Sequence, residues 1–519
     1  MKPATLVLLL ALAIRAAAAD RASPNAHVTP RFTDVSARRA AFDALLPEID
    51  REFRDYAAKK SYPGLVWGLV LDGELVHRGA VGFANVDKKI PAAADTRFRI
   101  ASMTKSFTAL AILQLRDAGK LTLSDPVANY VPELARTAPL TTDAPPITIH
   151  HLLTMSPGFP EDNPWGDRQL ADTVAEFQAF LRDGLALSNA PGVAFEYSNL
   201  AYALLGQIIT RVSGQPYQRH ITEKILRPLG MNATAWEFSA VPAAKLALGY
   251  RNREGTAGAW DPEPLLHDGT YGAMGGLLTT IDDFARYVAL HLAAWPPRDD
   301  PENPIARRAS LREMHLPAMF SGLAAQAKAL DGSAQPFVNA YGYGLGWSFD
   351  SRGTVRVGHS GGLPGFGSNW RFYPDHGFAV ISFANLTYAG TGAVNGKVGD
   401  LLIEKARLPR RALPPSPILA ARAAQVAQLV QAWEPALAEK IVAENFFLDR
   451  PLESWRAHAR AALAPAGAIR SVGDVDPENQ LRGAFDLIGE RGRVRVFFTL
   501  TPERDPRVQE LRLAFVPGP

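Results

Sequence analysis

The most informative stretch of this chain is FRIASMTKSF, residues 98–107. It holds the chain's only Ser-x-x-Lys pair, Ser102 and Lys105. Residues 103–115 are almost all apolar and contain no Gly or Pro, which predicts a buried helix that begins at or near Ser102. Residues three apart lie on one face of a helix, so the Lys105 ammonium can reach the Ser102 hydroxyl.

This pair can supply a nucleophile together with its base. A serine hydroxyl is a poor nucleophile until a base takes its proton. Burial and the dipole at a helix N-terminus both disfavour the charged form of a lysine, so a neutral Lys105 is a plausible base for Ser102. The alternative is a serine near a helix start beside an unrelated surface lysine, and other motifs must decide between the two.

The composition fits a globular protein without cysteine chemistry. The chain has 519 residues, of which 47% are hydrophobic and 21% charged, and it is too long for one ordinary core. Its net charge is +3 with Lys and Arg scattered, which gives no sign of a nucleic-acid-binding surface. Because cysteine is absent, disulfides, a thiol nucleophile and thiolate metal ligands are excluded.

The N-terminus has the pattern of a secretory signal peptide over residues 1–19. Lys2 precedes an apolar run, and Ala17-Ala-Ala19 fits a cleavage site. We therefore expect a periplasmic or secreted protein with no membrane span in the mature chain; the alternative is an uncleaved anchor.

The order of predicted elements indicates an α/β (α+β) fold. A hairpin is predicted over residues 64–81 around Asp72-Gly73. Residues 121–300 are mainly helical and loop-rich, whereas residues 341–385 predict four strands separated by Gly-rich turns. Strands at both ends would form one antiparallel sheet with helices between them.

The order of predicted elements divides the chain into four segments. After the signal peptide, residues 20–408 form the main domain, and PRRALPPSP, residues 409–417, is a linker. Residues 418–519 have helical patterns followed by alternating strands, which predicts a small α+β domain. That domain has no motif that carries chemistry.

A second candidate motif is Tyr197-Ser-Asn199, which precedes a strong helical pattern. Ser198 is a suitable N-cap for that helix, so Tyr197 would be held at a rigid helix start. A phenol can donate or accept a proton, and Asn199 offers a donor and an acceptor to a substrate. The alternative is a core tyrosine with a capping serine.

The third candidate is Gly358-His-Ser-Gly-Gly362, which we place between two strands. Glycines allow backbone N–H groups to approach a substrate carbonyl, and His359 can hydrogen-bond or titrate there. A tight turn with an exposed histidine is the alternative. The segment also matches the Gly-x-Ser-x-Gly elbow with Ser360 as nucleophile, but an elbow leads into a helix and residues 363–367, LPGFG, cannot form one.

Metal and cofactor motifs are missing. His150 and His151 are adjacent rather than four apart, and no His-Glu-x-x-His occurs. Because P-loop and dinucleotide fingerprints are also absent, we expect neither a metal nor an organic cofactor.

In their order and spacing, the motifs at 102–105, 197–199 and 359–362 resemble the serine β-lactamase and penicillin-binding-protein superfamily. They look like class C β-lactamases, family VIII esterases and D-amino-acid peptidases (peptidase family S12-like). The resemblance covers roughly residues 35–405. It implies a β-lactamase-like fold, in which helices flank an antiparallel sheet and form a helical subdomain.

By this resemblance, Ser102 would be the acylated nucleophile, and Lys105 and Tyr197 would share the proton transfers. The backbone N–H groups of Ser102 and Gly362 would form the oxyanion hole. The other motif residues would contact the substrate: Asn199, His359, Ser360 and Gly361.

One departure bears on the substrate. β-Lactamases and D-Ala-D-Ala peptidases usually have Lys-Thr-Gly where this chain has His359-Ser-Gly361. That lysine helps to bind a substrate carboxylate. A neutral histidine binds a carboxylate more weakly, so His359 favours esters or amides that lack this carboxylate.

The sequence therefore predicts an exported serine hydrolase that forms an acyl-enzyme on a small-molecule or peptide ester or amide. A D-amino-acid peptidase, a D-Ala-D-Ala carboxypeptidase or a β-lactamase is the enzymatic alternative. A penicillin-binding sensor that is acylated without turnover is the alternative of another class.

Overall fold

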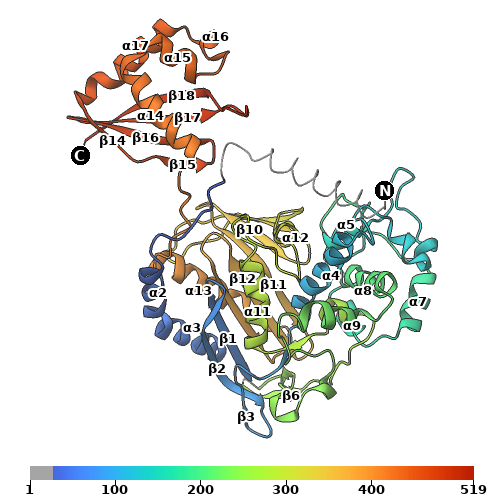
Figure 1. The fold of residues 1–519 in the computed structure, drawn as a ribbon. Helices are drawn as coiled ribbons and strands as arrows, with labels where there is room; N and C mark the ends of the chain where they lie inside the picture. The colour runs from blue at the N-terminus through green and yellow to red at the C-terminus, as the bar shows by residue number, and fades with distance from the viewer. Residues whose placement is uncertain (1–26, 257, 519) are drawn as a thin grey trace, which may run out of the picture. The chain divides into compact units, whose positions relative to one another are not determined.

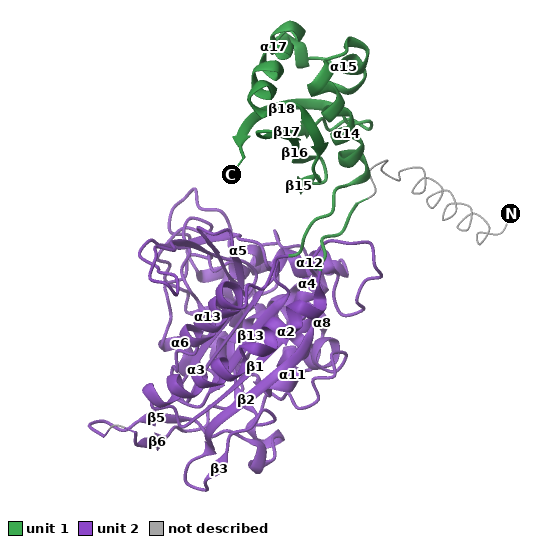
Figure 2. Cartoon of the chain, turned by 90° about the vertical axis from the view of Figure 1, so that its left-hand side faces the viewer, with its two compact units in different colours: residues 1–33, 411–519 green, residues 34–410 purple. Residues whose placement is uncertain are grey.

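The computed structural model describes residues 27–256 and 258–518, which divide into two compact units (Figure 2). The larger unit is Asp34–Arg410. The smaller one combines Arg411 onward with the described residues up to Thr33. The expected signal peptide lies outside the described residues. Within the described part, no helix is long and apolar enough to span a membrane.

A nine-stranded antiparallel sheet forms the centre of the larger unit (Figure 1). The hairpin near the start of the unit pairs with its last strand, since β1 lies beside β13. The strands, in order across the sheet, are β3 (Ile90–Pro91), β2 (Glu74–Asn85), β1 (Gly64–Leu71), β13 (Phe378–Ala384), β12 (Phe366–Tyr373), β11 (Val355–Leu363), β10 (Gly346–Asp350), β9 (Phe337–Tyr341) and β8 (Met319–Ala324).

Helices cover both faces of this sheet, and β1 is therefore buried on both sides. On one side, Trp67 of β1 stacks on Phe53 with ring centroids 4.9 Å apart. On the other, Val66 packs into the core that contains α4 and α11. The first face carries α2 (Val35–Ala44), α3 (Leu46–Lys59) and α13 (Gly392–Asp400), and the second carries α11 (Ile281–Leu292). The double burial explains the unbroken apolar sequence GLVWGLVL.

A helical part lies between the hairpin and the later strands, as the sequence predicts. Its centre is α4, which lies beside α8 (Figure 1) and also packs against α10. The helices are α4 (Lys105–Asp117), α5 (Ile149–Leu153), α6 (Trp165–Arg168), α7 (Val174–Arg182), α8 (Asn199–Ser213), α9 (Tyr217–Ile221), α10 (Gly272–Gly275) and α12 (Arg308–Met314).

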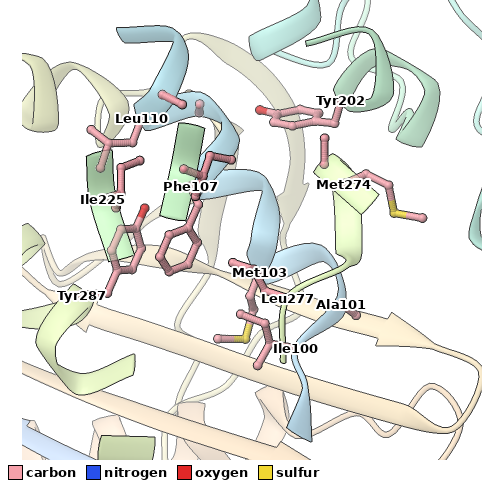
Figure 3. Packing of buried hydrophobic residues seen from close by; sticks show 14 of the residues in the cluster. Ile100, Ala101, Met103, Phe107, Leu110, Tyr202, Ile225, Met274, Leu277 and Tyr287 are labelled. Carbon is pink, nitrogen blue, oxygen red and sulfur yellow. The ribbon is translucent and has the colours of Figure 1, made fainter. Parts of the chain in front are cut away.

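The packing around α4 predicts which apolar side chain matters most for its position. Phe107 of α4 is fully buried and stacks on Tyr287 of α11 with ring centroids 3.7 Å apart (Figure 3). Phe107→Ala should lower the free energy of unfolding by about 3–5 kcal/mol, because it leaves a cavity in a close-packed core. Phe320→Ala, at a side chain that is 64% exposed on β8, should change it by less than about 0.5 kcal/mol. Urea denaturation of both variants measures the difference, and equal effects would contradict this assignment.

The predicted position of Gly358–Gly362 between two strands is wrong, because the whole segment lies inside β11. The actual turn follows at residues 364–365. Gly361 marks a close approach rather than a turn: a Cβ atom there would lie 2.2 Å from the Ile100 carbonyl oxygen. The edge strands β8 and β9 were not foreseen either.

The smaller unit is an α+β domain with a five-stranded antiparallel sheet. Residues 27–33 belong to it, since the Val28 N–H donates to Gln480 and Arg31 pairs with Ala412. Its elements are α14 (Pro417–Ala432), α15 (Pro435–Ile441), α16 (Phe446–Asp449), α17 (Leu452–Leu463), β14 (Ile469–Val472), β15 (Asp476–Asn479), β16 (Arg482–Gly489), β17 (Gly492–Leu500) and β18 (Val508–Pro517).

Candidate active site

Ser102 and Lys105 lie in direct contact. A 3₁₀ turn, Ala101–Thr104, carries Ser102, and α4 begins at Lys105. The turn starts from Ala101 in the left-handed region, with φ at 49°. Lys105 Nζ donates a hydrogen bond to Ser102 Oγ at 2.9 Å. The α-helix thus begins three residues later than Ser102, but the Ser-x-x-Lys spacing still brings the two side chains together.

The ammonium of Lys105 is enclosed by acceptors. The side chain is fully buried, and Nζ also donates to Asn199 Oδ1 at 2.7 Å and to the Met274 carbonyl oxygen at 3.1 Å. The Tyr197 ring centroid lies 4.9 Å from Nζ. These contacts, with the one to Ser102, hold the amine in one position beside the serine hydroxyl.

Burial shifts the pKa of Lys105 into the physiological range. It lowers this pKa from 10.5 to about 7, although the nearby carboxylates of Asp167 and Asp162 oppose the shift. Near neutral pH, therefore, a substantial fraction of Lys105 is an uncharged amine that can accept the proton of Ser102.

Tyr197 lies directly before α8 and faces the same group of residues. Its ring centroid is 6.2 Å from that of His359. Burial raises the pKa of the Tyr197 phenol well above its usual range, and a side-chain hydrogen bond with Ser102 opposes this shift. The phenol is thus protonated at neutral pH and can act as a proton donor rather than a base.

Asn199 is buried and its amide bonds to other protein groups. Oδ1 accepts from Lys105, while Nδ2 donates to Asn163 Oδ1 at 2.7 Å and to Asp167 Oδ1 at 3.2 Å. The expected substrate contact is therefore not the role that this position favours. The geometry favours a positioning role, in which Asn199 holds the Lys105 amine.

Two buried carboxylates in this network were missed by the sequence analysis. Asp162 accepts from the backbone N–H groups of Asn199 at 2.7 Å and Leu200 at 2.8 Å, which satisfies the first turn of α8. Asp167 accepts from Asn199 and from the Tyr388 hydroxyl at 3.0 Å. Burial raises the pKa of Asp167 to about 6, and the Lys105 charge opposes the shift. Asp162 lies in a loop and Asp167 in the short helix α6, and the sequence gives no signal for the role of either.

His359 is neutral and has a defined tautomer. Its Nδ1 contacts the Ser360 carbonyl oxygen, which can only accept, so Nδ1 carries the proton. Nε2 then accepts from the Tyr341 hydroxyl at 2.9 Å. Burial, reinforced by the Lys105 charge, lowers the pKa of His359 to about 3. His359 therefore cannot supply a positive charge at this position.

Strand β11 passes beside the Ser102 turn. Ser368 Oγ, on the neighbouring β12, donates to the Ile100 carbonyl oxygen at 2.7 Å, and Gly361 closely approaches the same oxygen. Ser360 is exposed and its Oγ accepts from Asn369 Nδ2 at 2.9 Å. Gly362 lies under Tyr388, whose ring would be 2.9 Å from a Cβ atom there. The structure thus brings the three sequence motifs to one place.

The group of residues offers a hydroxyl nucleophile, an amine whose pKa is near neutrality and a protonated phenol. Such a set can carry out acyl transfer with side chains alone. Among the residues that the structure describes, no cluster of three His, Asp or Glu side chains could hold a metal ion.

Comparisons with known proteins find a matching family and several similar proteins. The Beta-lactamase family model matches residues 49–404, which contain all three motifs. Protein flp of Staphylococcus aureus (strain NCTC 8325 / PS 47) is 30% identical over 345 residues, which are 65% of this chain and 63% of flp. An uncharacterized protein of Mycobacterium tuberculosis, MT1414, is 32% identical over 240 residues, 42% of this chain and 59% of that protein. The chain therefore spans less than two thirds of these relatives.

Solved structures share the fold. An octameric penicillin-binding protein homologue from Pyrococcus abyssi aligns with a TM-score of 0.58 at 23% identity, over 91% of this chain and 98% of its own. A penicillin-binding protein from Bacillus halodurans aligns with a TM-score of 0.53 at 25% identity, over 67% of this chain and 98% of its own. With the family model matched over most of the larger unit, the chain belongs to the Beta-lactamase family.

Proposed function

We propose that this protein hydrolyses an ester or amide through an acyl-enzyme on Ser102. The observation that carries the proposal is the 2.9 Å hydrogen bond between Ser102 Oγ and a buried Lys105 amine whose pKa is about 7. A serine needs a nearby base to become nucleophilic, and Lys105 is such a base in its neutral form.

The geometry supports a two-step reaction. In the first step, Lys105 takes the Ser102 proton while Oγ attacks the substrate carbonyl carbon. The backbone N–H groups of Ser102 and Gly362 are proposed to bind the oxyanion, and the leaving group departs with a proton from Lys105 or Tyr197. In the second step, a water molecule attacks the acyl carbon and gives its proton to whichever of Lys105 and Tyr197 protonated the leaving group. Ser102 Oγ then leaves the acyl carbon and takes a proton from Lys105, which releases the acid and restores Ser102.

The neutral His359 favours an esterase over a peptidase or β-lactamase that relies on a charged side chain at this position. Its protonated Nδ1 is occupied by the Ser360 carbonyl oxygen, and its Nε2 accepts from Tyr341. Neither nitrogen offers a free positive charge to a carboxylate. We propose an esterase-like activity for this reason, and export through residues 1–19 remains part of the proposal.

A panel of three substrates tests the function: a p-nitrophenyl ester, a chromogenic cephalosporin and a D-Ala-D-Ala peptide. We expect steady release of nitrophenol from the ester and little turnover of the other two. Intact-mass measurement during the reaction should show a transient acyl adduct. An adduct that persists without turnover would instead support a sensor, and preferred release of D-Ala would support a peptidase.

A further inference from the structure

A cavity of about 490 Å³ opens beside β11 and adjoins the candidate active site. His359 and Ser360 line one end of it, and Arg356 and Arg371 line its continuation along the sheet. Ser102 does not line the cavity. Ser360 faces away from the Ser102 turn, which Gly361 approaches, but β11 has no β10 partner beyond Gly358, so a substrate can pass from the nucleophile to the cavity at this edge.

The strand register places the polar lining on one face of the sheet. Ser360 lies opposite Asn369, and two positions further along Gly358 lies opposite Arg371. Residues directly opposite, or two apart along a strand, share a face. The hydrogen bond from Asn369 to Ser360 shows that both side chains occupy this face. Arg371 thus lies roughly 7 Å from Ser360 along the strand direction, since each residue rises about 3.3 Å.

The far end of the cavity carries a net positive charge, because Arg356, Arg371 and Lys328 line it against the single carboxylate of Asp400. Arg356 is paired with Asp350 at 2.7 Å and with Asp400 at 3.2 Å. Within residues 27–256 and 258–518, neither Arg371 nor Lys328 has a carboxylate within 4.0 Å. Arg371 is half-buried and Lys328 is exposed. Both also line an adjoining hollow of about 450 Å³, together with Lys397 and Asp400.

The walls between the two ends are suited to a short apolar chain. Phe337 and Tyr341 of β9, which the register places on the same face as Ser360, line the cavity. Aromatic rings pack well against methylene groups. A ligand that fits this lining has a carboxylate at one end and an apolar linker of a few carbons.

We propose that this cavity binds a carboxylate carried by the substrate, held by Arg371 and Lys328 at a distance of several atoms from the scissile bond. The inference rests on the proposed function of Ser102 and names its substrate class, a carboxylate-bearing ester or amide. Arg371 on β12 and Lys328 in the loop before β9 supply the positive charge for this carboxylate, since His359 is neutral.

Paired substrates test the inference. The acidic set is the p-nitrophenyl hemiesters of dicarboxylic acids from glutaric to suberic acid, and the neutral set is the p-nitrophenyl esters of the matching fatty acids. We expect Arg371→Gln and Lys328→Gln each to lower kcat/KM about tenfold for the best acidic ester, the loss of one charged hydrogen bond, with neutral esters unchanged. Lys88→Gln, at an exposed lysine between β2 and β3, is the charge-matched control and should change neither. Equal losses for both sets, or no loss, would overturn the inference.

Binding separates this inference from the proposed function. Suberate should bind to the Ser102→Ala protein in calorimetry, and Arg371→Gln added to that protein should weaken the binding about tenfold. If no ester is hydrolysed but suberate binding depends on Arg371, the anion site stands and the catalytic proposal fails. If acidic and neutral esters are hydrolysed equally well and suberate does not bind, the catalytic proposal stands and the anion site fails.

Discussion

Ser102→Ala should abolish ester hydrolysis, with kcat/KM reduced on the order of 10⁵–10⁶-fold, because it removes the only atom to which the acyl group is bound. The remaining Lys105 and Tyr197 can still polarise a water molecule, which accounts for any residual rate. The substitution removes one oxygen from a side chain that is 6% exposed, so the fold should persist. Steady-state kinetics and intact mass measure the effect, and the acyl adduct should be missing as well.

The matched control is Ser360→Ala. Ser360 is the serine of the Gly-x-Ser-x-Gly pattern, but it lies inside β11 and is followed by a turn rather than a helix. Its replacement should leave an ester without a carboxylate almost unaffected. Loss of activity in Ser360→Ala with activity retained in Ser102→Ala would show that the nucleophile assignment is wrong.

The sequence predicted best those features that depend on local pattern. β1 follows from its unbroken apolar run, and the helix of Lys105 follows from an apolar run without Gly or Pro. The turn between β1 and β2 follows from Asp72-Gly73, both of which adopt positive φ, at 53° and 88°. The family resemblance rested on three short motifs, and the structure places these motifs side by side.

The sequence failed where a role depends on distant partners. Gly358–Gly362 resembles a turn in composition, but its glycines allow β11 to pass beside the Ser102 turn, a contact between segments far apart in the chain. Asp162 lies in a loop and Asp167 in the short helix α6, and only the fold shows that both are buried near Lys105. Asn199 was expected to face the substrate because its buried partners could not be seen.

The role of Lys105 as the base predicts a second large effect. Lys105→Met should lower kcat/KM by roughly 10²–10⁴-fold at pH 7, the usual contribution of a general base. Methionine fills a similar volume but leaves Asn199 Oδ1 and the Met274 carbonyl oxygen without their donor. Thermal denaturation must show that the variant is folded at the assay temperature. A folded variant with near-wild-type activity would contradict the assignment of Lys105 as base.

The pH profile distinguishes a Lys105 that acts as the base from a lysine with only a structural role. Activity of the wild-type protein should rise with pH through about 7, where Lys105 loses its proton. The charge of Asp167 raises the pKa of Lys105, so Asp167→Asn should lower this pKa by roughly one unit and move the acid limb of kcat/KM to lower pH. Because the pKa of Asp167 is itself about 6, the two profiles should differ most between pH 6 and 7 and converge below it. Glu161→Gln changes the same charge at an exposed neighbour and should not move the limb. An acid limb that stays in place in Asp167→Asn would mean that a group other than Lys105 controls the reaction.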